Sequence, residues 1–142
     1  MKYFAIKSIV AVAALTVAGG IAAAQSLKVE IPFSFRAGET MMAPGTYLFT
    51  PNPTSMHTAA IQVRRYGQGG GVMLLATARD AARQWVETGV PKVQFDCMEG
   101  RCMLAKVWDG ISRDAMETRM SKRELQENAS LSVITLSAIR VK

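Results

Sequence analysis

The sequence has 142 residues, of which 49% are hydrophobic and 20% are charged, with 17 basic and 11 acidic side chains. The basic residues are scattered along the chain and do not form a stripe with aromatic side chains between them, which argues against a nucleic-acid-binding protein. A chain of this length suits one domain, with a core large enough to fold without a metal or a dense disulfide framework.

The first 24 residues have the pattern of a secretory signal peptide. Lys2 and Lys7 give a positively charged start, residues 8–18 are almost wholly apolar, and Ala22-Ala23-Ala24 has the small residues that signal peptidase accepts. A membrane anchor needs roughly 20 apolar residues, whereas this run is shorter and ends at a glycine pair. We therefore predict a cleaved signal peptide.

Cleavage is predicted between Ala24 and Gln25, which leaves residues 25–142 as a single β-rich domain. Removing the signal peptide takes away two lysines and no acid, so the net charge falls from +6 to +4. No later stretch is long and apolar enough to span a membrane. The sequence thus predicts a protein that is secreted or periplasmic, with no transmembrane anchor in its mature form.

Residues 27–36 alternate strictly between apolar and polar side chains, which is the pattern of a half-buried β-strand. Pro32 cannot donate a hydrogen bond within a sheet, so we expect this strand to lie at an edge or to pair on one side there. The apolar positions, which face one way, are Leu27, Val29, Ile31, Phe33 and Phe35.

A turn is predicted at residues 43–46. Pro44 and Gly45 occupy the second and third positions, which suits a type II turn because its third residue needs a positive φ. Residues 47–50 follow as a strand, and residues 51–55 form a proline-rich loop.

Residues 59–66 and 72–78 are interpreted as two strands, joined by the glycine-rich residues 67–71. A phosphate-binding loop would need a helix directly after the glycines. Because a β-type apolar run follows instead, we favour a hairpin over a nucleotide site.

Residues 79–88 allow two interpretations, a helical turn over 80–84 or a short strand over 84–87. Residues 92–97 and 102–108 are then predicted to form a second hairpin.

Cys97 and Cys102 are predicted to form a disulfide. If Glu99-Gly100 is a two-residue turn, Cys97 faces Cys102 with Cα atoms about 4.5 Å apart, at the short end of the disulfide range. Export brings the pair into an oxidising compartment. The spacing differs from the Cys-x-x-Cys pattern of redox sites, so we interpret the bridge as structural.

Residues 112–128 are the one stretch predicted to be helical, with Ser121 and Glu124 spaced as a capping box. Residues 131–141 form a final strand, which is either buried on both faces or carries a bulge near residue 134.

Together these elements predict an all-β fold with seven to eight short strands, either a single β-sandwich or a small partly open barrel, with one short helix before the last strand. The residues expected to form most of its core are Val29, Ile31, Phe33, Phe35, Tyr47, Phe49, Phe95, Val107 and Trp108.

Several short motifs resemble a family of small exported soil-bacterial proteins of unknown function. In that family an IPFxF strand leads to a PAGxY turn, and a later F…FL…VW hairpin leads to an SxxE segment. The matching segments here are residues 29–35, 43–47, 93–95, 103–108 and 121–124. This chain departs from the pattern in having Ala-Pro-Gly for Pro-Ala-Gly and two added cysteines. The resemblance implies export and a compact β-rich domain, and it supplies no catalytic residues.

Metal and nucleophile chemistry find little support in the sequence. His57 is the only histidine, whereas a zinc site takes three or four ligands and a catalytic triad needs its histidine held by a second residue. Met116 and Met120 could share a helix face and bind Cu(I), but methionine filling the core is the favoured interpretation. No cofactor and no catalytic residue are therefore predicted.

Seven carboxylates in the last third of the chain leave one enzymatic alternative open, a small extracytoplasmic hydrolase with paired carboxylates. We expect such acids to lie near turns and basic neighbours, where they serve solubility. A pocket that gathered Asp96, Asp109, Asp114 and Glu117 would favour the enzyme. The seven residues are Asp96, Glu99, Asp109, Asp114, Glu117, Glu124 and Glu127.

The favoured hypothesis is an exported, non-enzymatic β domain that acts through its surface. Its ligand is unknown, and the envelope or another protein is the expected partner.

Overall fold

The computed structural model of this protein describes residues 25–53, 58–118 and 131–141. Outside these residues lie several features singled out in the sequence: residues 1–24, His57, Met120, Ser121, Glu124 and Glu127.

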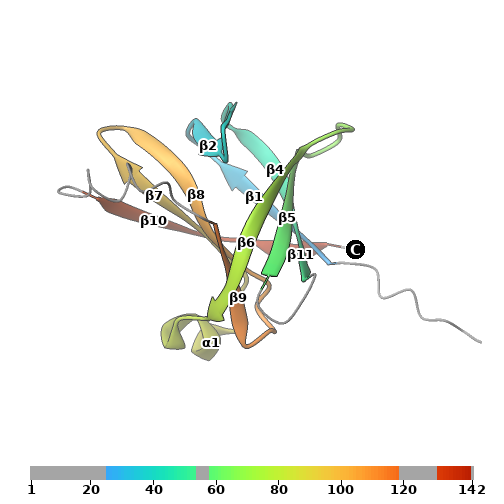
Figure 1. Cartoon of the computed structure of the whole chain (residues 1–142), viewed down its shortest axis with the longest axis vertical. Coiled ribbons are helices and arrows are strands. Elements are labelled where there is room, and N and C mark those ends of the chain that lie inside the picture. The colour runs from blue at the N-terminus through green and yellow to red at the C-terminus, as the bar shows by residue number, and fades with distance from the viewer. Residues whose placement is uncertain (1–24, 54–57, 119–130, 142) are drawn as a thin grey trace, which may run out of the picture.

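The described residues form eleven strands and one short helix (Figure 1). The predicted all-β class is confirmed, but the predicted count of seven to eight strands is too low, partly because two predicted strands are each divided. The elements in chain order are β1 (Ser26–Ile31), β2 (Phe35–Ala37), β3 (Thr40–Met42), β4 (Gly45–Pro53), β5 (Thr58–Arg65), β6 (Val72–Asp80), α1 (Arg83–Thr88), β7 (Lys92–Met98), β8 (Arg101–Trp108), β9 (Asp114–Thr118), β10 (Ser132–Ser137) and β11 (Ile139–Val141).

The main sheet runs in the order β10-β7-β8-β9-β6-β5-β4-β1-β11, with antiparallel neighbours throughout. Its two end strands are consecutive in the chain, separated only by Ala138, so one bent segment pairs with β7 and then with β1. Ala138 is buried, and its N–H donates to the carbonyl of Pro91 at 2.9 Å. The sheet therefore curls into a partly open barrel.

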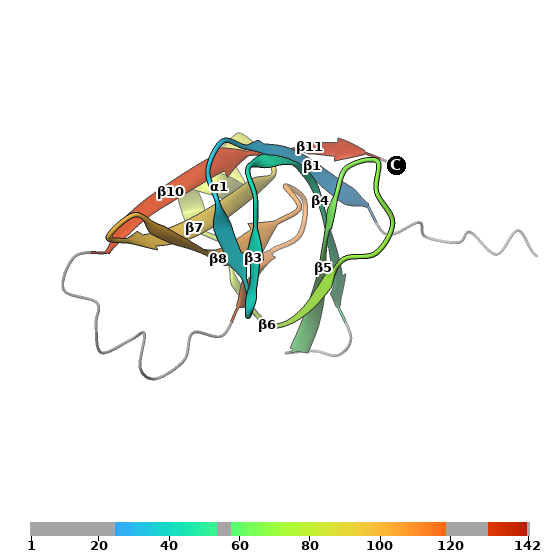
Figure 2. The same ribbon diagram turned by 90° about the horizontal axis from the view of Figure 1, so that it is seen from above.

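The barrel is least paired between β8 and β9, which share only two residue pairs. Nearer the start of β8, β2 pairs with this strand in parallel, which places Phe35 opposite Cys102. In Figure 2, β2 and β3 lie between the side formed by β10, β7 and β8 and the side formed by β1, β4 and β5. The β2–β3 hairpin thus occupies the opening and carries Phe35 into the core.

Aromatic rings fill the middle of the core. The Phe35 ring packs edge-on against Tyr47 and Phe95, at centroid distances of 5.1 and 5.2 Å. Phe33, which is half-buried, packs edge-on against Phe95 from the rim at 5.1 Å. Most residues of the predicted core lie here: Val29, Ile31, Phe35, Tyr47, Phe49, Phe95 and Val107.

Two predicted strands are each divided in two. Residues 27–36 alternate in burial as predicted, but the chain breaks at residues 32–34 so that β1 and β2 pair with different neighbours. Residues 131–141 bend at Ala138 and are mostly exposed, so the alternative of burial on both faces is wrong, and the irregularity lies at 138 and not near 134.

The predicted type II turn at residues 43–46 is wrong. Gly45 has no positive φ, and it opens β4. A Cβ at Gly45 would lie 2.9 Å from Nη2 of Arg65, whose guanidinium donates to the carbonyl of Pro44 at 3.2 Å.

The predicted helix over residues 112–128 is wrong where it can be compared. Residues 114–118 form β9, which pairs with β6 over five consecutive residues. This tertiary pairing overrides the helical propensity of Ala115, Met116 and Glu117. The one short helix of the described residues is α1. It lies within residues 79–88, for which the sequence allows either a helical turn or a short strand.

Candidate functional site

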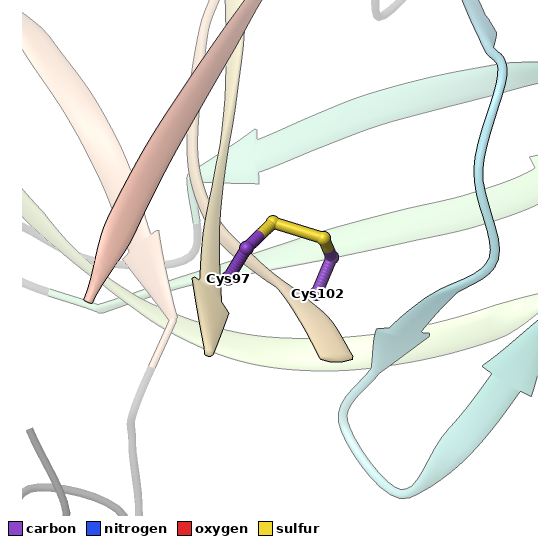
Figure 3. Close-up of a disulfide and its surroundings, with 2 residues drawn as sticks. All are labelled: Cys97 and Cys102. Carbon is purple, nitrogen blue, oxygen red and sulfur yellow. A yellow bond between two sulfur atoms is a disulfide. The ribbon is translucent and has the colours of Figure 1, made fainter. Parts of the chain in front are cut away.

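The predicted β7–β8 hairpin brings Cys97 directly opposite Cys102 (Figure 3). The two sulfur atoms lie 2.06 Å apart, as in a disulfide bond, and the two Cα atoms lie 4.0 Å apart. The turn residues Glu99 and Gly100 both have positive φ, at 50° and 77°, as a type I′ hairpin requires. Both cysteines are buried at the margin of the core, in keeping with a structural bridge.

Polar side chains line up across four neighbouring strands on the outer face of the barrel. Gln94 of β7 lies opposite Lys106 of β8, which in turn lies opposite Glu117 of β9. Arg79 of β6 continues the line, because its Nε lies 3.6 Å from Oε2 of Glu117. We call these four residues the polar row.

A shallow hollow lies between the polar row and Trp85 of helix α1. Its walls are the polar row together with Asp80, Ala82, Trp85 and Ala115. Its volume is about 30 Å³, whereas sites for small molecules usually enclose roughly 300–1,000 Å³. The hollow therefore has room for a water molecule or the tip of one side chain.

Asp96 lies two residues beyond Gln94 on β7, facing the same side of the sheet. Partial burial raises the pKa of Asp96 above its ordinary value of 3.8; a hydrogen bond with Gln94 and the charge of Lys106 oppose the rise, and the charge of Glu117 adds to it. Of the four acids whose convergence would indicate a hydrolase, Asp96 and Glu117 are thus near enough to influence each other.

The other candidate carboxylates have local structural roles. Asp109 accepts hydrogen bonds from two backbone N–H groups of its own loop, at 2.9 and 2.7 Å, and so closes the connection after β8. Asp114 lies opposite Asp80 at the end of the β6–β9 ladder, and Glu99 occupies the hairpin turn. The hollow contains Glu117 but does not gather Asp96, Asp109 and Asp114 as well.

Trp108 is buried but lies outside the main core cluster. Its neighbour Val107 faces that core, so Trp108 points to the opposite side, where its ring lies 6.4 Å from that of Trp85. Its indole N–H donates to the carbonyl of Ser112 at 2.7 Å. Helix α1 and the following loops therefore cover a second, smaller apolar layer. The prediction that Trp108 belongs to the main core is wrong, because its side chain lies in this layer.

A second outer surface lies across β11, β1, β4 and β5. Ile139, Lys28, Leu48 and Arg64 lie opposite one another in register, and Nζ of Lys28 lies 4.0 Å from the centroid of the Tyr66 ring. We call these five residues the cationic patch. Leu48 is only 7% exposed yet lies outside the core cluster, and in register it lies between two long side chains whose aliphatic stems can cover it.

The two cations of the patch have no acidic partner in the part of the chain that the structure describes. Among the described residues, no carboxylate lies within ion-pair distance of Lys28 or Arg64. Nε of Arg64 is buried without a hydrogen-bond partner. The apolar side chains beside them are open to solvent, because Tyr66 is 53% exposed and Ile139 is 69% exposed.

Within residues 25–53, 58–118 and 131–141, no three His, Cys, Asp or Glu side chains are grouped so that they could hold a metal ion. Met116 does not lie on the predicted helix face, because β9 turns it into the core, where it is 9% exposed. This placement agrees with the interpretation of Met116 as a core-filling residue.

The fold and these surfaces define a small all-β domain with a disulfide-linked hairpin. Comparison with protein-family models, curated proteins and solved structures finds no match. In the described part of the chain, no helix combines the length and the apolar character that a membrane crossing needs.

Neither the polar row nor the cationic patch is predicted from the sequence. The period-two pattern places Lys28 on a strand face, whereas Glu117 falls in the stretch predicted to be helical. Residues become neighbours across a sheet only through its register. Lys28 and Arg64 are 36 positions apart in the sequence, and no local signal there indicates that Leu48 lies between them.

Proposed function

We propose that this protein is an exported, non-enzymatic binding domain that associates with the cell envelope through the cationic patch. The signal-peptide pattern of residues 1–24 and the resemblance to small exported soil-bacterial proteins support export. The Cys97–Cys102 bridge also supports it, because structural disulfides persist in oxidising compartments outside the cytoplasm.

The observation that carries the binding function is the chemistry of the patch. A stable surface normally disperses its charges among carboxylates, whereas Lys28 and Arg64 have none within ion-pair distance among the described residues. Exposed Tyr66 and Ile139 flank the two cations. A partner that supplies negative charge and apolar contact would satisfy both features at once.

Binding of the exported protein to cell-envelope fragments from its own host tests the proposal. Sedimentation should recover the wild-type protein with the fragments at low salt, and the Lys28→Gln/Arg64→Gln variant should stay in solution. The matched control is Arg83→Gln/Arg113→Gln, which removes equal charge from exposed side chains near α1. Equal binding by wild type and the Lys28→Gln/Arg64→Gln variant would contradict the proposal.

The alternative function, a small hydrolase, is favoured by one observation. Asp96 has a raised pKa, caused chiefly by partial burial, and lies near Lys106 and Glu117. A raised pKa favours the protonated form of a carboxyl group, which is the form that acts as a general acid, with a second carboxylate as base or nucleophile.

Hydrolysis of a panel of chromogenic glycosides and esters tests this alternative. A hydrolase would lose turnover in both Asp96→Asn and Glu117→Gln while the melting temperature of each variant stayed at the wild-type value. Asp109→Asn provides the comparison, because Asp109 closes its own loop away from the hollow. Absence of turnover in the wild-type protein across the panel would count against the alternative.

A further inference from the structure

We propose that the partner of the cationic patch is an anionic lipid surface of the cell envelope. This inference rests on the proposed binding function and names its ligand. It follows from three features of the patch: two cations with no carboxylate of the described residues within ion-pair distance, exposed apolar groups beside them, and their arrangement across a sheet face.

The charge of the patch calls for an anionic partner. Lys28 and Arg64 flank Leu48 in direct register, so their Cα atoms are two strand spacings apart, about 10 Å. Two side chains at this spacing can each contact the headgroup of a different anionic lipid. Glu30, two residues along β1 from Lys28, is the acid on the same outer side of this strand, and it is exposed.

The apolar members distinguish a lipid surface from a soluble polyanion. Ile139 lies opposite Lys28 and is 69% exposed. Tyr66 is 53% exposed, and the Lys28 ammonium lies over its ring in a cation–π contact. A tyrosine ring with an apolar body and a polar tip suits the boundary between headgroups and acyl chains. Lysine and arginine can lay their stems along apolar groups while their charges reach the headgroups.

The register spreads these groups over the outer face of four strands, β11, β1, β4 and β5. The hollow described above lies across other strands, between β6 and β7 and under α1. The cationic patch therefore offers a broad contact surface, which suits a second surface better than a single small molecule. Two basic side chains give reversible, salt-sensitive attachment and not permanent anchoring.

Sedimentation with defined vesicles provides the test. The exported protein should bind vesicles of mixed phosphatidylglycerol and phosphatidylcholine, and should not bind vesicles of phosphatidylcholine alone. Each basic side chain near an anionic membrane contributes about 1 kcal/mol, so the partition coefficient of Lys28→Gln/Arg64→Gln should fall about 30-fold. Arg83→Gln/Arg113→Gln should keep the wild-type value, and added salt should weaken binding.

Two further variants separate charge from apolar contact. Glu30→Gln removes a negative charge beside Lys28, so it should bind the anionic vesicles more tightly than wild type, about fivefold. Ile139→Asn keeps every charge and should bind them less tightly. Unfolding curves identify any variant whose fold is damaged, and the Glu30→Gln result stands independently because it predicts a gain.

The outcomes separate this inference from the proposed function. Binding to envelope fragments that needs Lys28 and Arg64, without binding to anionic vesicles, would overturn the lipid assignment and leave the binding function standing. Equal binding to a soluble anionic polysaccharide, or equal loss in both double variants, would also overturn the lipid assignment. Binding to neither vesicles nor envelope fragments would overturn both.

Discussion

Phe33 and Phe35 are two residues apart and face the same side of the chain, yet they contribute differently to the core. The Phe35 side chain is fully buried between Tyr47 and Phe95, whereas Phe33 is half-buried against Phe95 alone. Phe35→Ala should therefore lower the free energy of unfolding by about 3–5 kcal/mol, and Phe33→Ala by about half as much. Urea unfolding of both variants measures the difference, and equal losses would contradict this packing.

Asp96 makes stability depend on pH. Because burial raises its pKa in the folded state above 3.8, the folded protein keeps a proton on Asp96 at pH values where the unfolded chain has lost it. The folded state then binds more protons, so this carboxyl group lowers the free energy of unfolding as pH rises above 3.8.

Asp96→Asn removes this dependence. The variant should gain stability over the wild-type protein as pH rises through the window between the unfolded and the folded pKa. Urea unfolding at a series of pH values measures the gain, and an NMR titration of the Asp96 carboxyl carbon measures the pKa itself. A variant that loses stability relative to wild type across this window would show that burial does not dominate the site.

At the residue scale, alternation in the sequence predicts which side chains are buried but not which residues they pack against. The pattern from residue 27 to residue 36 agrees with the observed burial. Trp108 is predicted to lie in the core because it is large and apolar, but the layer beneath α1 covers it instead. Which apolar group covers a buried residue depends on tertiary packing, on which period two carries no information.

Among the elements, the β2–β3 hairpin depends on a close approach at its turn. Gly38 has φ +62°, and a Cβ there would lie 2.6 Å from Cδ2 of Leu74 on β6. Gly100, in the β7–β8 turn, has φ +77° and nothing within 4 Å of its Cβ position. Alanine at Gly100 should cost about 1–2 kcal/mol for the left-handed backbone, and alanine at Gly38 should cost more because it also displaces Leu74.

Thermal unfolding of Gly38→Ala and Gly100→Ala measures the two costs. The excess cost at Gly38 reports the contact between the hairpin and β6. If both variants lost the same stability, the hairpin would not press against Leu74.

The disulfide should contribute modestly to stability. It closes a loop of only six residues from Cys97 to Cys102, for which the chain-entropy estimate is about 2 kcal/mol. Reduction should therefore lower the free energy of unfolding by about that amount and leave the fold intact. The Cys97→Ser/Cys102→Ser variant should be equally stable with and without reductant. Free thiols in the native protein would contradict the bridge.

Hairpins were the elements that the sequence predicted best. Short turns with Gly100 or a run of glycines join adjacent strands, so both the turn and the pairing are local. The elements predicted wrongly pair at long range: β9 belongs to the sheet because β6 holds it, and Ala138 divides the last strand because β7 and β1 are separate partners. A linear pattern does not contain these partners.

For the whole molecule, the order of the strands decides which residues can act together. Closure by β10 and β11 brings the end of the described chain beside β1, which places Ile139 next to Lys28. The same closure separates the cationic patch, across β11, β1, β4 and β5, from the polar row, across β6, β9, β8 and β7. The two proposed functions therefore use different sides of one barrel.

This separation allows a single measurement to test whether binding uses the cationic patch. NMR spectra of the isotope-labelled protein, recorded while cell-envelope fragments are added, report which backbone signals weaken on contact. We expect the signals of Lys28, Leu48, Arg64, Tyr66 and Ile139 to weaken first, with those of Gln94, Lys106 and Glu117 unchanged. Weakening confined to Gln94, Lys106 and Glu117 would contradict binding through the cationic patch.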